Sequence, residues 1–178
     1  MATNVAMLRG VNVGAHNRIK MPALVDVFTG LGHTNVVTYI QSGNVVFRSR
    51  SKSSAALARA IAERITLDLG VEVSVLIRSR DELAAVVEAN PFLRTKADPG
   101  RLHVTFLAEL PDGDAVRALE KFDAGPDEAR VVGREVYLHC PKGYGASKLN
   151  PAFIERRFRA ISTTRNWNTV TKLLELAG

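Results

Sequence analysis

Hydrophobic and polar positions along the first half of the chain follow two different periods. Alternation with a period of two is typical of half-buried strands, and recurrence at every third or fourth residue is typical of amphipathic helices. This pattern predicts strands over residues 3–8, 36–42, 45–47 and 71–77, and helices over residues 22–31, 54–69 and 81–89. The resulting element order is β-α-β-β-α-β with one further helix.

The stretch of residues 36–47 is predicted to be the hairpin around which the first half is built. Gly43-Asn44 suits a two-residue II′ turn, because glycine adopts the positive φ of the first central position at little cost. With this turn, Ile40 faces Phe47 on the core side of the sheet. One face then packs on helices and the other stays partly polar, as in an antiparallel sheet.

The same element order recurs in the second half. It predicts strands over residues 102–107, 128–132, 135–139 and 160–164, and helices that begin after Asp112, Asn150 and Asn166. From element order, we predict an α+β fold of two ferredoxin-like (βαββαβ) pseudo-repeats, with helices packed on antiparallel sheets. The expected domains are residues 1–94 and 101–178, joined by a linker at residues 95–100.

Composition and charge narrow the classes of function. The chain has 178 residues, of which 46% are hydrophobic and 24% charged, as in ordinary globular proteins. Its net charge of +6 admits a nucleotide or nucleic acid as partner, although a solvated basic surface explains the charge equally well. Cys140 is the only cysteine, so an intrachain disulfide is impossible. No run approaches the length of a membrane span, and we expect a cytoplasmic monomer without a membrane partner.

Four segments carry a resemblance to a known family. They are LRGVNVG at residues 8–14, TYIQSGNVVF at residues 38–47, GYGASK at residues 143–148 and TRNWNT at residues 164–169. Together they resemble the bacterial family DUF1697, a domain of unknown function, and the resemblance covers nearly the whole chain. It implies an α+β fold of two related halves, and it implies no established activity or catalytic residues.

The first candidate for chemistry is the loop that carries Arg9 and Asn12. It follows a strand and precedes a helix, as a phosphate-binding turn does. Its glycines do not have the spacing of the dinucleotide fingerprint. A strand-ending loop that needs positive φ explains them equally well.

The second candidate is the loop that carries Lys142, Ser147 and Lys148 and leads into a helix start at Asn150. Its glycines expose backbone N–H groups, the serine adds a hydroxyl and the lysines add charge, a combination suited to an anion. The order and spacing of a Walker A loop are absent. The alternative is a connector with incidental lysines.

The segment at residues 164–169 offers two alternatives for Arg165, which either clamps an anion bidentately or bonds carbonyls of the preceding loop. Trp167 is expected to anchor the core. The histidines do not cluster, so no metal site and no cofactor are indicated. His139 and Cys140 are adjacent on a strand and point to opposite faces, which argues against a Cys-His dyad.

These features favour a binding module for a phosphate-bearing ligand, either a nucleotide or a nucleic-acid backbone. Recognition of RNA by stacking is disfavoured because residues 3–8 contain no aromatic side chain and aromatic content is only 6%. An enzyme acting on a phosphorylated small molecule is a second possibility, weakened by the lack of an evident general base, and a protein-interaction module is a third. The expected ligand contacts are Arg9, Asn12, Lys142, Ser147, Lys148 and Arg165.

Overall fold

The computed structural model describes all residues, 1–178, and the chain forms two compact units of the α+β class. The first unit comprises Met1–Ala84 and Lys172–Gly178, and the second comprises Ala85–Thr171. Each unit contains one four-stranded antiparallel sheet. The predicted domains, residues 1–94 and 101–178 with a linker at residues 95–100, stay a prediction.

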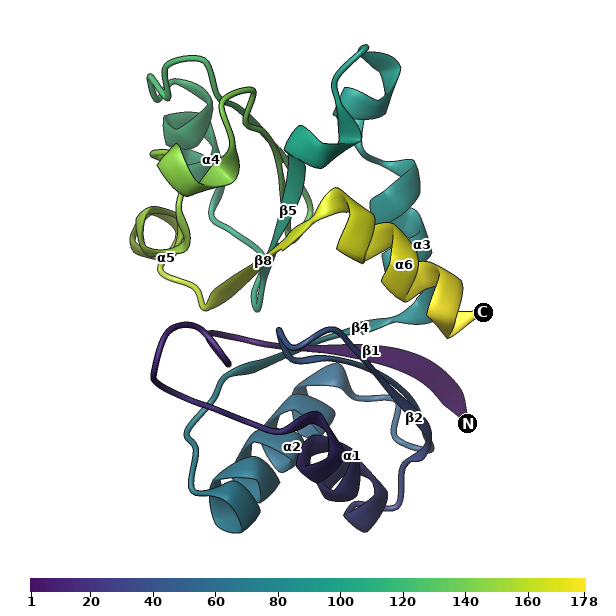
Figure 1. Cartoon of the computed structure of the whole chain (residues 1–178). Coiled ribbons are helices and arrows are strands. Elements are labelled where there is room, and N and C mark those ends of the chain that lie inside the picture. The colour runs from purple at the N-terminus through teal and green to yellow at the C-terminus, as the bar shows by residue number, and fades with distance from the viewer. The chain divides into compact units, whose positions relative to one another are not determined.

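The first unit is a sheet with helices α1 and α2 on one face (Figure 1). Its elements are β1 (Ala2–Leu8), α1 (Met21–Gly30), β2 (Thr34–Tyr39), β3 (Asn44–Ser49), α2 (Ser54–Leu69) and β4 (Val75–Ser79), followed by α3 (Arg80–Glu88), which continues into the second unit. The strand order is β2-β3-β1-β4. The predicted element order is therefore present in this unit.

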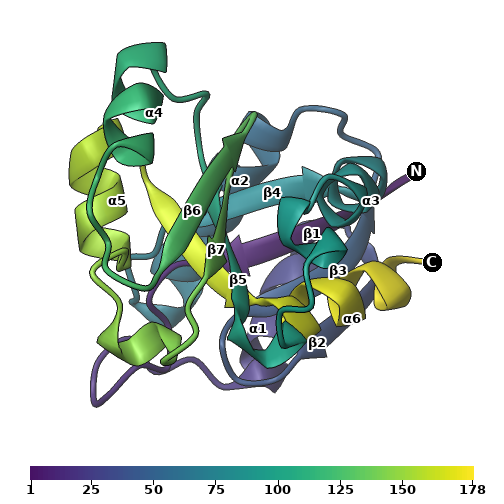
Figure 2. The ribbon, with the colours of Figure 1, turned by 90° about the horizontal axis from the view of Figure 1, so that it is seen from above.

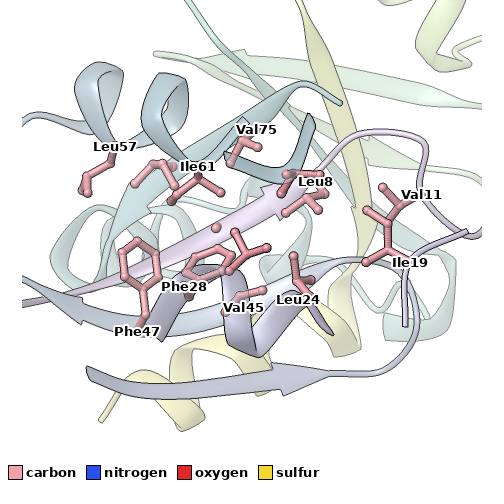
Figure 3. Packing of buried hydrophobic residues seen from close by; sticks show 14 of the residues in the cluster. Leu8, Val11, Ile19, Leu24, Phe28, Val45, Phe47, Leu57, Ile61 and Val75 are labelled. Atoms are coloured by element: carbon pink, nitrogen blue, oxygen red, sulfur yellow. The ribbon is translucent and has the colours of Figure 1, made fainter. Parts of the chain in front are cut away.

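The core of the first unit lies between the sheet and these two helices (Figure 3). The predicted stripe of α2 faces inward, since Leu57, Ile61 and Ile65 are all buried. On the sheet side, the ring of Phe47 meets that of Phe28 edge to face, with centroids 5.0 Å apart. Burial of these side chains fixes which face of each strand points toward the helices.

Local signals set both ends of α2. The Ser53 hydroxyl accepts a hydrogen bond from the Ala56 N–H at 3.2 Å, which satisfies one of the N–H groups left open at the helix start. At the other end Gly70 adopts the left-handed conformation with φ of 66°. The bounds of α2 follow from these two local signals.

The predicted hairpin register is wrong. Tyr39 pairs with Asn44, so the connection is a four-residue loop and not a two-residue turn, and Ile40 is 50% exposed instead of facing the core. The buried Asn44 side chain explains the difference, because its Nδ2 donates to the Tyr39 carbonyl at 3.2 Å and to the Ser42 hydroxyl at 2.9 Å. These bonds close a loop over residues 40–43, so β2 ends at Tyr39, three residues before Ser42, where the predicted strand ends.

The fourth strand also differs from its predicted range of residues 71–77. Strand β4 pairs with β1 from Leu8 opposite Val75 to Asn4 opposite Ser79. Because β1 ends at Leu8, the residues before Val75 have no strand beside them. Val71 and Val73 still pack against the core, so their alternation signals burial without strand pairing.

The second unit has the same kind of sheet, with α4 and α5 side by side on one face (Figure 2). Its elements are η1 (Pro91–Arg94), η2 (Pro99–Arg101), β5 (Leu102–Leu107), α4 (Gly113–Glu120), β6 (Glu128–Val132), β7 (Glu135–His139), η3 (Tyr144–Ala146), α5 (Pro151–Phe158), β8 (Ser162–Asn166) and α6 (Trp167–Ala177), the last of which continues into the first unit. The strand order is β6-β7-β5-β8. The predicted bounds of β5, β6 and β7 are confirmed.

Polar side chains start the three helices of this unit at the predicted residues. Asp112 accepts from the Asp114 N–H at 2.7 Å, Asn150 from the Phe153 N–H at 3.0 Å, and Asn166 from the Thr169 N–H at 2.8 Å.

Two further expectations concern the end of the chain. Trp167 is only 5% exposed, as expected of a core anchor. Strand β8 lies two residues later than predicted, because its pairing with β5 runs from Ser162 to Asn166.

No helix of the structure is both long enough and apolar enough to cross a bilayer.

Candidate functional site

The predicted contact residues belong to different units. Arg9 and Asn12 lie in the first unit, and Lys142, Ser147, Lys148 and Arg165 lie in the second. Each loop is therefore a feature of its own unit.

The loop after β1 is organised by the side chain of Asn12. Its Nδ2 donates to the carbonyls of Ile19 at 3.0 Å and Gln41 at 2.6 Å, and its Oδ1 accepts from the Ile19 N–H at 2.8 Å. Both amide hydrogens are thus engaged by the backbone. Asn12 holds the loop beside the β2–β3 connection, and the loop presents the exposed cations Arg9, Arg18 and Lys20.

The loop between β7 and α5 is closed by its own backbone. The Gly143 N–H donates to the Cys140 carbonyl at 2.9 Å and the Ser147 N–H donates to the Tyr144 carbonyl at 3.0 Å, which forms the short helix η3. Gly143 has φ of 97°, a conformation that side chains rarely adopt. The Ser147 hydroxyl is buried and accepts from the Leu149 N–H at 3.0 Å, so it shapes the entry into α5.

An aromatic stack fixes this loop on the sheet. The ring of Tyr144 lies on that of His103, with centroids 4.7 Å apart and an angle of 23° between the ring planes. The Tyr144 hydroxyl donates to Thr164 Oγ1 at 3.1 Å, and Thr164 shares a 2.8 Å hydrogen bond with Thr105. Sequence reasoning missed both rings as parts of the site.

Burial keeps both rings of the stack neutral near pH 7. It lowers the pKa of His103, an effect that the backbone at Arg101 partly opposes, and it raises the pKa of Tyr144. The stack therefore adds rigidity and no charge to the loop.

Three cations surround the loop. Lys142 and Lys148 are exposed, and the exposed Arg101 places Nη1 3.2 Å from the position that a Cβ of Gly143 would occupy. None of the three has an acidic side chain within ion-pairing distance. Arg101 could have been found from the strand register, because Leu102 pairs with His139 and brings the residue before β5 beside the residues after β7.

Arg165 points away from this loop. It lies opposite Val104 on β5, whereas Thr164, its neighbour in β8, lies opposite Thr105 and bonds Tyr144. Since successive side chains of a strand point to opposite faces, the sheet separates Arg165 from the loop. The structure brings Lys142, Ser147 and Lys148 together and does not bring Arg165 to them.

The guanidinium of Arg165 has partners within its own strand. It donates to Thr163 Oγ1 at 2.7 Å and to the Thr164 carbonyl at 3.0 Å, and the residue is 8% exposed. Burial lowers its pKa to about 10, so it remains charged at neutral pH. One of these partners is a carbonyl, but it belongs to β8 and not to the preceding loop, whose carbonyls were one of the two predicted alternatives.

Nucleophilic and metal chemistry receive no support from the side chains near the loop. Cys140 is fully buried, and burial raises the pKa of its thiol, which leaves it protonated at neutral pH. No group of three or more His, Cys, Asp or Glu side chains in the structure is placed to hold a metal ion. What the arrangement offers is positive charge on an ordered loop.

The comparisons with known proteins agree with the resemblance seen in the sequence. The family described as "Protein of unknown function (DUF1697)" matches residues 1–137 of the chain. The chain belongs to this family. The family description states no activity, and among the curated proteins none matches the chain.

A solved structure supports the fold of this DUF1697 member. It is that of the conserved bacterial protein SP0830 from Streptococcus pneumoniae, which is 24% identical in sequence. The two structures have a TM-score of 0.78, and the similarity covers 99% of each chain. This likeness concerns the fold alone.

Proposed function

We propose that the protein is a binding module for a phosphate-bearing ligand, a nucleotide or a nucleic-acid backbone, and that the loop at residues 142–148 is its principal contact. The supporting observation is the set of Arg101, Lys142 and Lys148, three exposed cations without acidic partners around one ordered glycine-containing loop. An unpaired cation at the surface keeps its full attraction for an incoming anion.

The chemistry of these groups suits phosphate. A guanidinium matches two phosphate oxygens with parallel N–H donors, and an ammonium adds a compact point charge. Because the stack of Tyr144 on His103 holds the loop on the sheet, less conformational entropy is lost when a ligand binds.

The other predicted residues have subsidiary roles in the proposal. Arg9 is proposed as an anion contact of the first unit's own loop, Asn12 and Ser147 shape the two loops, and Arg165 is not a contact of the loop at residues 142–148 because it lies on the opposite face of its sheet. We further propose that each unit is a ferredoxin-like repeat of a duplicated chain, supported by the shared element order and the corresponding strand orders. The working protein is proposed to be a cytoplasmic monomer.

Ligand-induced thermal shifts test the proposal. The native state gains about 2.7 kcal/mol when a ligand is present at a hundredfold excess over its dissociation constant. We expect phosphate, nucleotides or short oligonucleotides to raise the melting temperature of the wild type, and the double variant Lys142→Ala with Lys148→Ala to lose most of that rise.

The matched control removes the same charge elsewhere. Lys52 and Lys96 are exposed in other loops, so the double variant Lys52→Ala with Lys96→Ala is expected to keep the wild-type shift. A wild type that responds to none of these anions, or a control that loses the shift equally, contradicts the proposal.

A further inference from the structure

A second cluster of cations lies at the end of α5, away from the loop described above. Arg156, Arg157 and Arg159, with Phe153, line a pocket of about 330 Å³. The pocket runs along α5 from Phe153 in the first turn to Arg159 at the helix end, and neither Arg101 nor any residue of the loop at 142–148 lines it. The pocket is therefore distinct from the proposed loop site.

No acidic side chain neutralises the three guanidinium groups. None of them forms an ion pair in the structure, and no acidic residue lines the pocket. The nearest acid in sequence, Glu155, accepts from the Ser162 N–H at 2.9 Å. Three like charges at one pocket repel one another unless an anion joins them.

One of the guanidinium groups is held in place by aromatic rings. The Cζ atom of Arg157 lies 5.3 Å from the ring centroid of Phe153 and 6.0 Å from that of Phe122, and the two rings are 4.5 Å apart. Stacking of this kind orients the planar group. The site is thus partly organised without a ligand.

Helix stability accounts for only part of the cluster. Basic side chains in a last turn interact favourably with the helix dipole, which explains Arg156 and Arg157. Arg159 is different, because it ends the helix in the left-handed conformation with φ of 50°, where glycine or asparagine is usual. An arginine at this position is unfavourable for the backbone and supplies a third charge to the pocket.

We propose that this pocket binds a compact polyanion, a group of two or three linked phosphates. Three arginines line this space, a charge too high for a single monoanion to neutralise, and closely linked phosphates carry several negative charges within one small volume. The site takes the phosphate chain itself, whether free or attached to a nucleoside, and it operates independently of the loop at residues 142–148.

Calorimetry with inorganic triphosphate at low salt tests this site. The variant Lys142→Ala with Lys148→Ala serves as the parent, so that the loop does not contribute. We expect this parent to bind triphosphate at one site and inorganic monophosphate much more weakly. Adding Arg156→Gln and Arg159→Gln is expected to weaken the triphosphate affinity by about tenfold for each guanidinium removed.

The control adds Arg50→Gln and Arg94→Gln to the same parent, which removes two exposed arginines, one after β3 and one at the end of η1. It should leave the affinity within about twofold of the parent. Should Arg156→Gln with Arg159→Gln not fold, Arg159→Gly removes one guanidinium at a position where glycine is favoured. A nucleoside triphosphate titrated in parallel shows whether a nucleoside adds affinity.

The results separate the two sites. Failure of the parent to bind triphosphate, or equal weakening by the pocket and control substitutions, overturns the pocket proposal. Neither result bears on the loop, because the loop is tested through Lys142 and Lys148 in the otherwise unchanged protein.

Discussion

Gly43 illustrates how the absence of a side chain holds the first loop together. Its φ is 76°, and a Cβ built on it would lie 2.5 Å from Val11 Cγ2 and 2.8 Å from Leu8 Cβ. Its carbonyl also accepts from the Leu8 N–H at 2.9 Å. Close approach and positive φ both require glycine at this position.

Gly43→Ala should therefore destabilise the fold by about 2–4 kcal/mol, the sum of a left-handed backbone penalty and overpacking against two buried side chains. Urea unfolding measures the change. Gly14→Ala is the matched control, because Gly14 has φ of 63° but nothing within 4 Å of its Cβ position, and it should cost only about 1 kcal/mol. Equal costs at the two positions would show that the contact with Val11 and Leu8 is unimportant.

His103 should make stability depend on pH. Its Nδ1 is buried without a hydrogen-bond partner, and burial lowers its pKa below the usual 6.5, as it does for His33. The unfolded chain then binds protons more readily than the folded chain, so the free energy of unfolding is highest above about pH 6.5 and falls as the pH drops below it.

His103→Phe keeps a ring stacked on Tyr144 and removes the titrating group. Urea midpoints compared at pH 7.5 and pH 5 are expected to fall less in this variant than in the wild type, with the remaining fall contributed by His33. His16→Gln, in an exposed loop, should behave as the wild type. An unchanged fall in His103→Phe would mean that its lowered pKa does not affect stability.

Asn12 and Asn44 show how much of the hydrogen bonding in a loop can be predicted from the sequence. Asn44 and Asn12 stand in glycine-containing loops, so a role in turns is predictable for both. Their partners are not, because the carbonyls of Tyr39 and Gln41 come within reach only after the strands have paired. The hairpin register was wrong for this reason.

At the scale of elements, two effects oppose each other at Arg159, the residue that ends α5. The left-handed backbone favours glycine there, whereas the pocket gains a positive charge from arginine. Arg159→Gly is expected to raise the free energy of unfolding by about 0.5–1 kcal/mol, since glycine adopts φ of 50° without the penalty of a Cβ. Arg156→Gly, three residues earlier inside the helix, should lower it by about 1 kcal/mol. Thermal and urea unfolding of the two variants measure these changes in the free energy of unfolding. A loss of stability in Arg159→Gly would show that arginine is not unfavourable for the backbone at this position.

Helices were predicted more closely than strands because their ends are encoded locally. Ser53, Asp112 and Asn150 each bond an N–H two or three residues ahead, so the sequence near a helix is sufficient to place its start. A strand ends where its partner ends. Strand β4 begins at Val75 because β1 stops at Leu8, and that limit is invisible in the alternation of residues 71–77.

For the molecule as a whole, the α+β class and the loop at residues 142–148 were predictable, and the neighbours of that loop were not. Lys142 and Lys148 are close in sequence to the glycines that mark the loop. Arg101 and His103 lie some forty residues away along the chain, and the pairing of β5 with β7 brings them to it. Arg165 was grouped with the loop by charge, although strand alternation turns it to the other face of the sheet.

The basic charge of the whole chain makes salt dependence the sharpest test of a nucleic-acid ligand. With a net charge of +6, weak attraction to any polyanion is expected, so binding alone does not locate a site. The slope of log affinity against log salt counts phosphates released from counterions, at about −0.7 for each contact on a single strand. If Lys142 and Lys148 each contact a phosphate, their double alanine variant should reduce the slope by about 1.4, while Lys52→Ala with Lys96→Ala should leave it unchanged. Fluorescence anisotropy of a labelled oligonucleotide over a range of salt concentrations gives both slopes. Equal slopes in all three proteins would place the contacts elsewhere on the surface. An affinity of the wild type that does not change with salt concentration would indicate a small ligand instead of a nucleic acid.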